Sequence, residues 1–158
     1  MPEYTRGDYL ISTDPGLLDL DSIYAFVSRS YWGLGRPKEI MKRALENSLC
    51  FGIYDLSATG TMGGREHARQ IGLVRVVTDH AVFAYLCDVY ILEEYRRQGL
   101  GKWLLETVMA YPDLQGLRRL ALCTRDAHDF YRKYGFQGLE SPGKWMELFT
   151  PYHIDRDS

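Results

Sequence analysis

A short basic turn holds the residues of this chain that could do chemistry. Gly99 and Gly101 lack a Cβ, so a ligand can approach the backbone closely at this point. The first amides of the helix that follows have no partner within the helix, and the helix dipole adds positive potential there. Arg96, Arg97 and Lys102 place positive charge around the same position. The turn therefore favours an anionic ligand, and phosphate is the natural one.

The turn departs from two familiar phosphate-binding patterns. A Walker A loop requires glycine at position 96 and serine or threonine at position 103, where this chain has Arg96 and Trp103. A dinucleotide-binding turn requires a third glycine where this chain has Leu104. The turn alone leaves open a tight strand-to-helix connection with solvated arginines.

Two motifs taken together indicate a family. The pattern Arg or Gln, two residues, Gly, one residue, then Gly or Ala matches residues 96–101. The pattern Ala-x-x-Phe-Tyr-x-x-x-Gly-Phe matches residues 127–136. In both motifs the chain resembles the GCN5-related N-acetyltransferase (GNAT) family. The resemblance implies a single domain over residues 1–158, with acetyl-CoA as co-substrate. The implied fold is α/β, with a mixed, mostly antiparallel central sheet flanked by helices and one splayed pair of strands.

The resemblance also implies where acetyl-CoA would lie. Its pantetheine arm would run along the strand 81–91, near the backbone of Val89 and Ile91. That strand would diverge from the strand 117–124 and open a V for the arm. Thr124 stands where many family members have asparagine, and it could still donate one hydrogen bond. The residues expected around the pyrophosphate are Arg96, Arg97, Gln98, Gly99, Leu100, Gly101 and Lys102.

Direct acetyl transfer requires that an amine lose a proton, that an oxyanion be stabilised and that the CoA thiolate gain a proton. Tyr131 matches the tyrosine that many family members use to protonate the thiolate. The base is harder to assign, because Asp88 is the only carboxylate of its strand. Strand alternation places Asp88 on the face opposite to Tyr85, unless a bulge changes the parity. Tyr85 is therefore a candidate catalytic residue that faces the substrate or relays a proton. Asp88 is either a substrate contact or a structural carboxylate, and His128 is a further candidate base.

The acceptor pocket is expected near Tyr31 and Trp32, which follow the first helix. Core packing explains Tyr31 equally well. The glycine-rich loop 57–69 could cover the site or be idle surface. We expect a small-molecule amine as acceptor, because the net charge of −2 offers no strong field for a polybasic or polyanionic partner. A peptide amine stays open, as does a non-catalytic module that binds acetyl-CoA as a sensor.

Hydrophobic periodicity predicts the elements that position these residues. The strand 81–91 is apolar on both parities, which predicts burial on both faces. Strands are predicted at 9–13, 48–56, 70–78, 81–91, 117–124 and 144–149, and helices within 14–33 and at 37–47, 100–111 and 126–136.

The remaining composition points to an ordinary globular protein. The N-terminus has no signal-peptide pattern, and no apolar run approaches the length of a membrane span. Cys50, Cys87 and Cys123 each lie in or beside an apolar run, which predicts reduced thiols and a cytoplasmic protein. The histidines show no metal-ligand spacing, so we expect no metal. We expect neither nucleic acid nor membrane as a partner, and a homodimer stays open.

Overall fold

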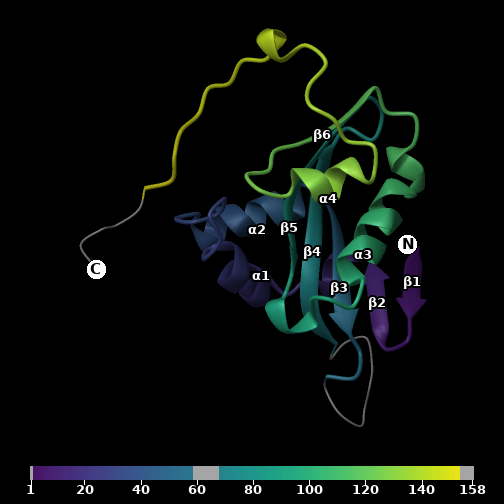
Figure 1. Cartoon of the computed structure of the whole chain (residues 1–158). Helices are drawn as coiled ribbons and strands as arrows, with labels where there is room; N and C mark the ends of the chain where they lie inside the picture. Colours follow the sequence, from purple (N-terminus) through teal and green to yellow (C-terminus); the bar gives the residue numbers. More distant parts are fainter. Residues whose placement is uncertain (1, 59–67, 154–158) are drawn as a thin grey trace.

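A six-stranded sheet in the order β1-β2-β3-β4-β5-β6 forms the centre of the molecule (Figure 1). The computed structural model describes residues 2–58 and 68–153. The first four strand pairs are antiparallel, and β5 and β6 are parallel. This arrangement confirms the predicted mixed, mostly antiparallel sheet. The strands are β1 (Glu3–Arg6), β2 (Tyr9–Ser12), β3 (Leu49–Asp55), β4 (Arg69–Thr78), β5 (Phe83–Ile91) and β6 (Arg119–Leu122).

Helices cover both faces of the sheet and divide the core in two. On one face α1 and α2 pack with Leu73 and Tyr90 of the sheet. On the other face α3 and α4 pack with Val74 and Val76. The predicted apolar stripe of α3 is buried in this second half of the core. The helices are α1 (Leu20–Val27), α2 (Lys38–Glu46), α3 (Leu100–Met109) and α4 (His128–Arg132).

A bulge interrupts the pairing of β4 with β5. Leu73 pairs with Tyr90, but Arg75 pairs with Cys87, so β5 carries one extra residue between these pairs. Asp88 lies at this point with a φ of 50°, which is the left-handed region. Such an inserted residue reverses the side-chain parity of the strand beyond it.

The bulge places the half-buried residues of β5 on two different faces. Tyr85 and Cys87 lie on the face covered by α1 and α2, whereas Val89 and Ile91 pack against the half of the core that α3 contributes. All four side chains are half-buried, and the residues between them are buried. Buried residues of β5 lie on both faces, as predicted, but in each half of the strand one face is only half-buried, because these four residues line cavities.

The pair β5–β6 is splayed, as predicted. The two strands pair only over residues 83–86 and 119–122. Beyond these pairs β5 continues to Ile91, while β6 has ended. A gap consequently opens along the second half of β5.

The predicted strands differ from those of the structure in two places. The predicted strand 144–149 is wrong, because Lys144 ends a short 3-10 helix and residues 145–149 pair with no strand among the described residues. Its composition suits a strand, but a strand also requires a neighbour with which to share hydrogen bonds. β1 is a strand that the periodicity did not predict. Most of the loop 57–69 lies outside the described residues. No helix in the described part of the chain has the length and apolar character needed to cross a bilayer.

Candidate active site

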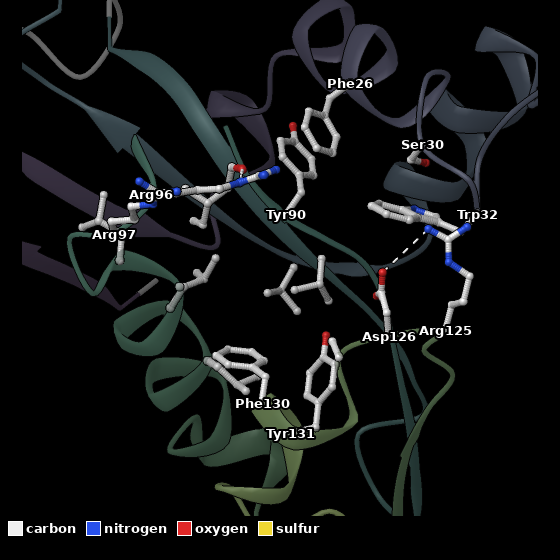
Figure 2. A pocket seen from close by; sticks show the side chains of 18 of the residues that line it. Phe26, Ser30, Trp32, Tyr90, Arg96, Arg97, Arg125, Asp126, Phe130 and Tyr131 are labelled. Carbon is white, nitrogen blue, oxygen red and sulfur yellow. Dashed lines mark hydrogen bonds and ion pairs between the residues drawn. The ribbon is translucent and has the colours of Figure 1, made fainter. Parts of the chain in front are cut away.

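An elongated cavity of about 690 Å³ fills the gap beside β5. Figure 2 shows Arg96 and Arg97 at one end of it, and Trp32, Arg125 and Asp126 at the other. The cavity is lined from both halves of the core because the sheet is open at this edge. Its shape provides a basic end, a long apolar middle and a polar far end.

The basic end is built by the N-terminus of α3. Gly99 has a φ of 79° and Arg97 a φ of 68°, so the chain turns sharply into the helix. The first helical bond runs from the N–H of Trp103 to the carbonyl of Gly99, at 3.0 Å, and leaves the earlier amides without an intrahelical acceptor. A Cβ at Gly99 would meet nothing within 4 Å, and one at Gly101 would lie 3.8 Å from Ile91 Cγ1. This open space above free amides fits a phosphate group.

Of the predicted pyrophosphate residues, Arg96, Arg97, Gly99, Leu100 and Gly101 line the cavity. The Nε of Arg96 donates to the carbonyl of Ile91 at 2.9 Å, which fixes this side chain at the cavity mouth. The side chain of Gln98 bonds to two neighbouring tyrosines, so only its backbone is available to a ligand in this arrangement. Lys102 does not line the cavity.

The free edge of β5 faces the long middle of the cavity. The N–H of Leu92 donates to the carbonyl of Ile71 at 2.8 Å, toward β4. Successive residues of a strand direct their backbone groups to opposite edges. The backbone groups of Val89 and Ile91 therefore point into the gap that β6 leaves. An extended ligand with amide groups could pair with them there.

A second cavity, of about 420 Å³, joins the first at its polar end. It extends along the first half of β5, where Tyr85, Cys87 and Asp88 line it. Two ligands that enter these cavities from opposite sides would meet at the shared wall. The residues that line both cavities are Tyr31, Trp32, Val89, Arg125, Asp126, Ala127 and Tyr131.

Tyr131 stands at the junction of the two cavities. Its ring packs edge-on against Phe130 and Phe136, with ring centres 5.2 and 5.8 Å apart, and the residue is 8% exposed. Figure 2 shows its hydroxyl directed into the cavity. Burial, and to a smaller extent Tyr31, raises the pKa of Tyr131 to about 12. The phenol therefore keeps its proton at neutral pH and is suited to donate it.

Asp88 is engaged by three neighbours. Its carboxylate accepts hydrogen bonds from Arg36 Nη1 at 2.8 and 3.0 Å, from Arg75 Nε at 2.7 Å and from Trp32 Nε1 at 2.9 Å. Burial opposes the charge, but the guanidinium groups of Arg75 and Arg36 hold the pKa of Asp88 below its ordinary value. The side chain of Asp88 has no exposed surface. It is thus an ionised carboxylate that fixes the indole of Trp32, and an acceptor cannot touch it in this structure.

A clasp formed by Tyr31 and Arg125 spans the gap. The backbone N–H of Arg125 donates to the Tyr31 hydroxyl at 3.1 Å, and the Arg125 guanidinium lies 3.9 Å from the centre of the Tyr31 ring. Trp32 packs edge-on against Tyr31, with ring centres 5.2 Å apart. The predicted acceptor wall is therefore one aromatic unit, and it joins the α1–α2 connection to the β6–α4 connection.

The other predicted residues lie around the second cavity. Tyr85 lines it, and the pKa of Tyr85 is raised by burial and by the neighbouring Cys123. Thr124 also lines it, but its hydroxyl accepts a hydrogen bond from the N–H of Ala127 at 3.0 Å. His128 lines neither cavity. Within the described ranges, no group of His, Cys, Asp and Glu could hold a metal ion.

Sequence reasoning missed three residues of the site. Phe26 stacks on Tyr90 with ring centres 4.0 Å apart, and both line the larger cavity. Arg125 and Asp126 line both cavities, and their side chains form an ion pair at 3.7 Å. The sequence did contain a signal for Arg125 and Asp126, because both directly follow the predicted strand 117–124. Loops at the ends of parallel strands commonly carry site residues. No periodicity distinguishes Phe26 from a core residue.

Comparisons with known proteins agree with this geometry. A sequence model of the family described as Acetyltransferase (GNAT) domain matches residues 61–138. The Gibberella zeae protein FG08082, which is named as an acetyltransferase, is 41% identical over an alignment of 143 residues, and the match covers 82% of this chain and 79% of that protein. The crystal structure of a GNAT-family protein from Xanthomonas campestris pv. campestris is 42% identical, with a TM-score of 0.80 over 90% of this chain and 94% of that one. A GNAT-family acetyltransferase of Elizabethkingia anophelis, solved with acetyl-CoA bound, shares the fold at 14% identity, with a TM-score of 0.57 over 92% of this chain and 90% of that one.

Proposed function

The chain belongs to the GNAT family of acetyltransferases, and from this premise we propose that it moves the acetyl group of acetyl-CoA directly to the amine of a small molecule. One observation carries the proposal: two cavities, one of which ends at the free amides of α3 beside Arg96 and Arg97, meet at a wall that contains Tyr131. A donor and an acceptor can thus be bound together, as direct transfer within a ternary complex requires.

The larger cavity suits acetyl-CoA. The free amides at the start of α3, with Arg96 and Arg97 beside them, would hold the pyrophosphate. The backbone of Val89 and Ile91 would pair with the amides of the pantetheine arm along the free edge of β5. The fold neighbour from Elizabethkingia anophelis binds acetyl-CoA, which supports the same ligand here. The thioester would then reach the junction of the two cavities.

Tyr131 would donate the proton that the departing thiolate needs. Its phenol is protonated at neutral pH, because burial raises its pKa to about 12. As the amine nitrogen bonds to the acetyl carbon, the carbon–sulfur bond breaks and the electron pair stays on sulfur. A proton transferred from Tyr131 to that sulfur yields free CoA thiol. Solvent then reprotonates the phenolate.

The smaller cavity suits a compact amine. Its aromatic wall of Tyr31 and Trp32 is held in place by Asp88, which we therefore assign to positioning. Alkyl ammonium groups are charged at neutral pH, so the amine must lose a proton before it attacks. Among the described residues that line both cavities, Asp126 is the carboxylate, and Tyr85 lies on the acceptor side. We assign proton removal to Asp126, with Tyr85 and water as the relay.

The proposal is tested with a broad panel of small amines, by release of CoA thiol and mass spectrometry of the products. We expect acetylation of at least one amine. Tyr131→Phe should then lower kcat by about 10²–10⁴-fold, the usual scale for a positioned acid. Acetyl-CoA affinity should persist, because the ring is kept. Tyr134→Phe is the matched control, since it removes a hydroxyl from the same region without lining either cavity.

Three results would contradict parts of the proposal. Wild-type kcat in Tyr131→Phe would remove this residue from the mechanism. Acetylation of peptides but of no small amine would replace the proposed acceptor class. Tight binding of acetyl-CoA without any transfer would favour the sensor that the sequence left open. The compartment is a separate proposal: Cys50, Cys87 and Cys123 are unpaired, which suits a reducing compartment such as the cytoplasm.

A further inference from the structure

The smaller cavity carries more positive than negative charge. Among the described residues that line it, the charged ones are Arg36, Arg75, Arg125, Asp88 and Asp126. Arg125 and Asp126 form an ion pair of their own at 3.7 Å, so their charges offset each other. Asp88 is shared between Arg36 and Arg75. One positive charge of this group of three is therefore not compensated within the cavity wall.

The group of three is also shielded from solvent. The side chains of Arg36 and Arg75 are 10% and 12% exposed, and that of Asp88 has no exposed surface. A charge with so little water around it interacts strongly with a second charge that comes within a few ångströms. An uncompensated charge is costly at this depth. An anion bound here would therefore lower the free energy of the site.

Both guanidinium groups have a donor to spare. Arg36 donates from Nη1 to Asp88 and from Nε to Tyr152. Arg75 donates from Nε to Asp88 and from Nη1 to Ser48 Oγ. No residue in the described part of the chain accepts a hydrogen bond from the Nη2 of either arginine. Neither Nη2 is a fully enclosed atom without a partner, so both can donate to a ligand in the cavity.

The two arginines lie away from the junction with the larger cavity. Arg36 and Arg75 line the smaller cavity alone, whereas Asp126 and Tyr131 line both. An acceptor whose amine reaches Asp126 would therefore direct its other end toward the arginines. The smaller cavity thus suits a molecule with an amine at one end and an anion at the other.

A carboxylate fits the arginine end better than a phosphate does. It brings one negative charge, which equals the uncompensated positive charge, and its two oxygens can accept from guanidinium N–H groups. A phosphate monoester carries about −1.5 to −2 at pH 7. That charge would exceed what the arginines leave uncompensated and would repel the buried carboxylate of Asp88.

We propose that Arg36 and Arg75 form a carboxylate site through their Nη2 groups, and that the acceptor is accordingly an amino acid. Its amine would lie at the junction beside Asp126. The product would be an N-acetyl amino acid, whose carboxylate takes no part in bond making. The inference names the acceptor class and therefore rests on the proposed function.

Matched pairs of acceptors test the charge in the wild-type enzyme. The panel holds the standard amino acids with β- and γ-amino acids, each beside its carboxamide, which keeps the amine and removes the negative charge. Release of CoA thiol gives kcat/KM for each compound. We expect the best amino acid to exceed its carboxamide by about 10–10²-fold, the scale of one hydrogen bond to a charged group.

Arg75→Gln tests the site from the side of the protein. The change removes the uncompensated charge, and the glutamine amide can still donate to Asp88. The ratio between acid and carboxamide should fall toward one, whereas the Kd for acetyl-CoA should stay the same, because Arg75 does not line the larger cavity. A merely structural role would lower both rates together and leave their ratio unchanged. Arg43→Gln is the matched control, since Arg43 is exposed on α2 and lines neither cavity.

Calorimetric titration of the amino acids into protein saturated with CoA measures acceptor binding without turnover. Amino acids that bind through Arg75 but are not acetylated would contradict the proposed transfer and support the carboxylate site. Acetylation of neutral amines and carboxamides as fast as of amino acids would overturn the site and leave the proposed function standing. Binding of no amino acid would also overturn it, as would a preference for the phosphate esters of amino alcohols.

Discussion

Replacement of Gly101 by alanine should stabilise the free protein, whereas replacement by valine should weaken acetyl-CoA binding, because the family pattern has glycine or alanine at this position and no larger residue. Gly101 is the second residue of α3, and the new Cβ would lie 3.8 Å from Ile91 Cγ1, an ordinary contact. Alanine exceeds glycine as a helix former by up to about 1 kcal/mol in a helix interior. At the first turn we expect about half of that, which raises Tm by roughly 1–2 °C in a domain of this size.

The larger side chain of valine would project into the larger cavity, which Gly101 lines. There it would stand between the pyrophosphate and the amides that we propose to hold it. A hydrogen bond to a charged group contributes about 1.5–3 kcal/mol. The loss of one or two such bonds, about 3 kcal/mol together, corresponds to a rise of roughly 10²-fold in the Kd for acetyl-CoA.

Calorimetric titration measures the affinity, and thermal unfolding without ligand measures the stability. Gly143→Val is the control, because a Cβ at Gly143 would meet nothing within 4 Å and the residue lies outside the larger cavity. Gly99 is less informative as a test position, since its φ of 79° strains any other residue and would lower stability by itself. Unchanged affinity in Gly101→Val would refute the assigned phosphate position. A free Gly101→Ala variant whose Tm falls by several degrees would refute the steric reasoning.

Two further predictions concern the charge of Asp88 and the reactivity of the three thiols. Asp88→Asn removes the charge that faces two buried guanidinium groups and should cost about 3 kcal/mol, or roughly 6–12 °C in Tm. Because the pKa of Asp88 is lowered on folding, its stabilisation is present above the unfolded pKa of about 3.9 and is lost as the pH falls toward the folded value. Denaturant unfolding should show that the gap between wild type and variant narrows below about pH 4, and a constant gap would contradict the argument. A disulfide reagent at mildly alkaline pH should label Cys123 first, because Cys123 is exposed whereas burial raises the pKa of Cys50 to about 12 and that of Cys87 to about 11. Three thiols should titrate after denaturation, and a count of two or fewer would contradict the unpaired state.

The sequence predicted those features that depend on neighbouring residues. The turn with Gly99 and Gly101 can be recognised because free amides and glycines act within a few positions of one another. Tyr131 could be proposed as the proton donor because it lies within a motif of several residues, 127–136. The comparisons confirm the family that these two motifs indicated. The splayed pair followed from the family and is present in the structure.

Features that depend on distant contacts could not be predicted in the same way. The ion-pair partners of Asp88 are Arg36, 52 positions away in sequence, and Arg75, 13 positions away, so no local pattern connects them. Tyr31 and Arg125 form their clasp over 94 positions. The predicted strand 144–149 failed for the same reason, because its composition is right but a strand partner is supplied by another part of a fold or by another molecule.

The bulge at Asp88 also separates the β5 residues proposed to contact the acceptor from those proposed to contact the donor. Without the bulge, four residues of β5 would face the same side of the sheet, namely Tyr85, Cys87, Val89 and Ile91. A substitution chosen for a new acceptor would then also alter the surface proposed to carry the donor. With the bulge, the strand presents Tyr85 and Cys87 to the smaller cavity, Ile91 to the larger cavity and Val89 to both. Under the proposed function, acceptor preference can therefore be changed by substitution at positions 85 and 87 while Ile91 keeps its contact with the donor.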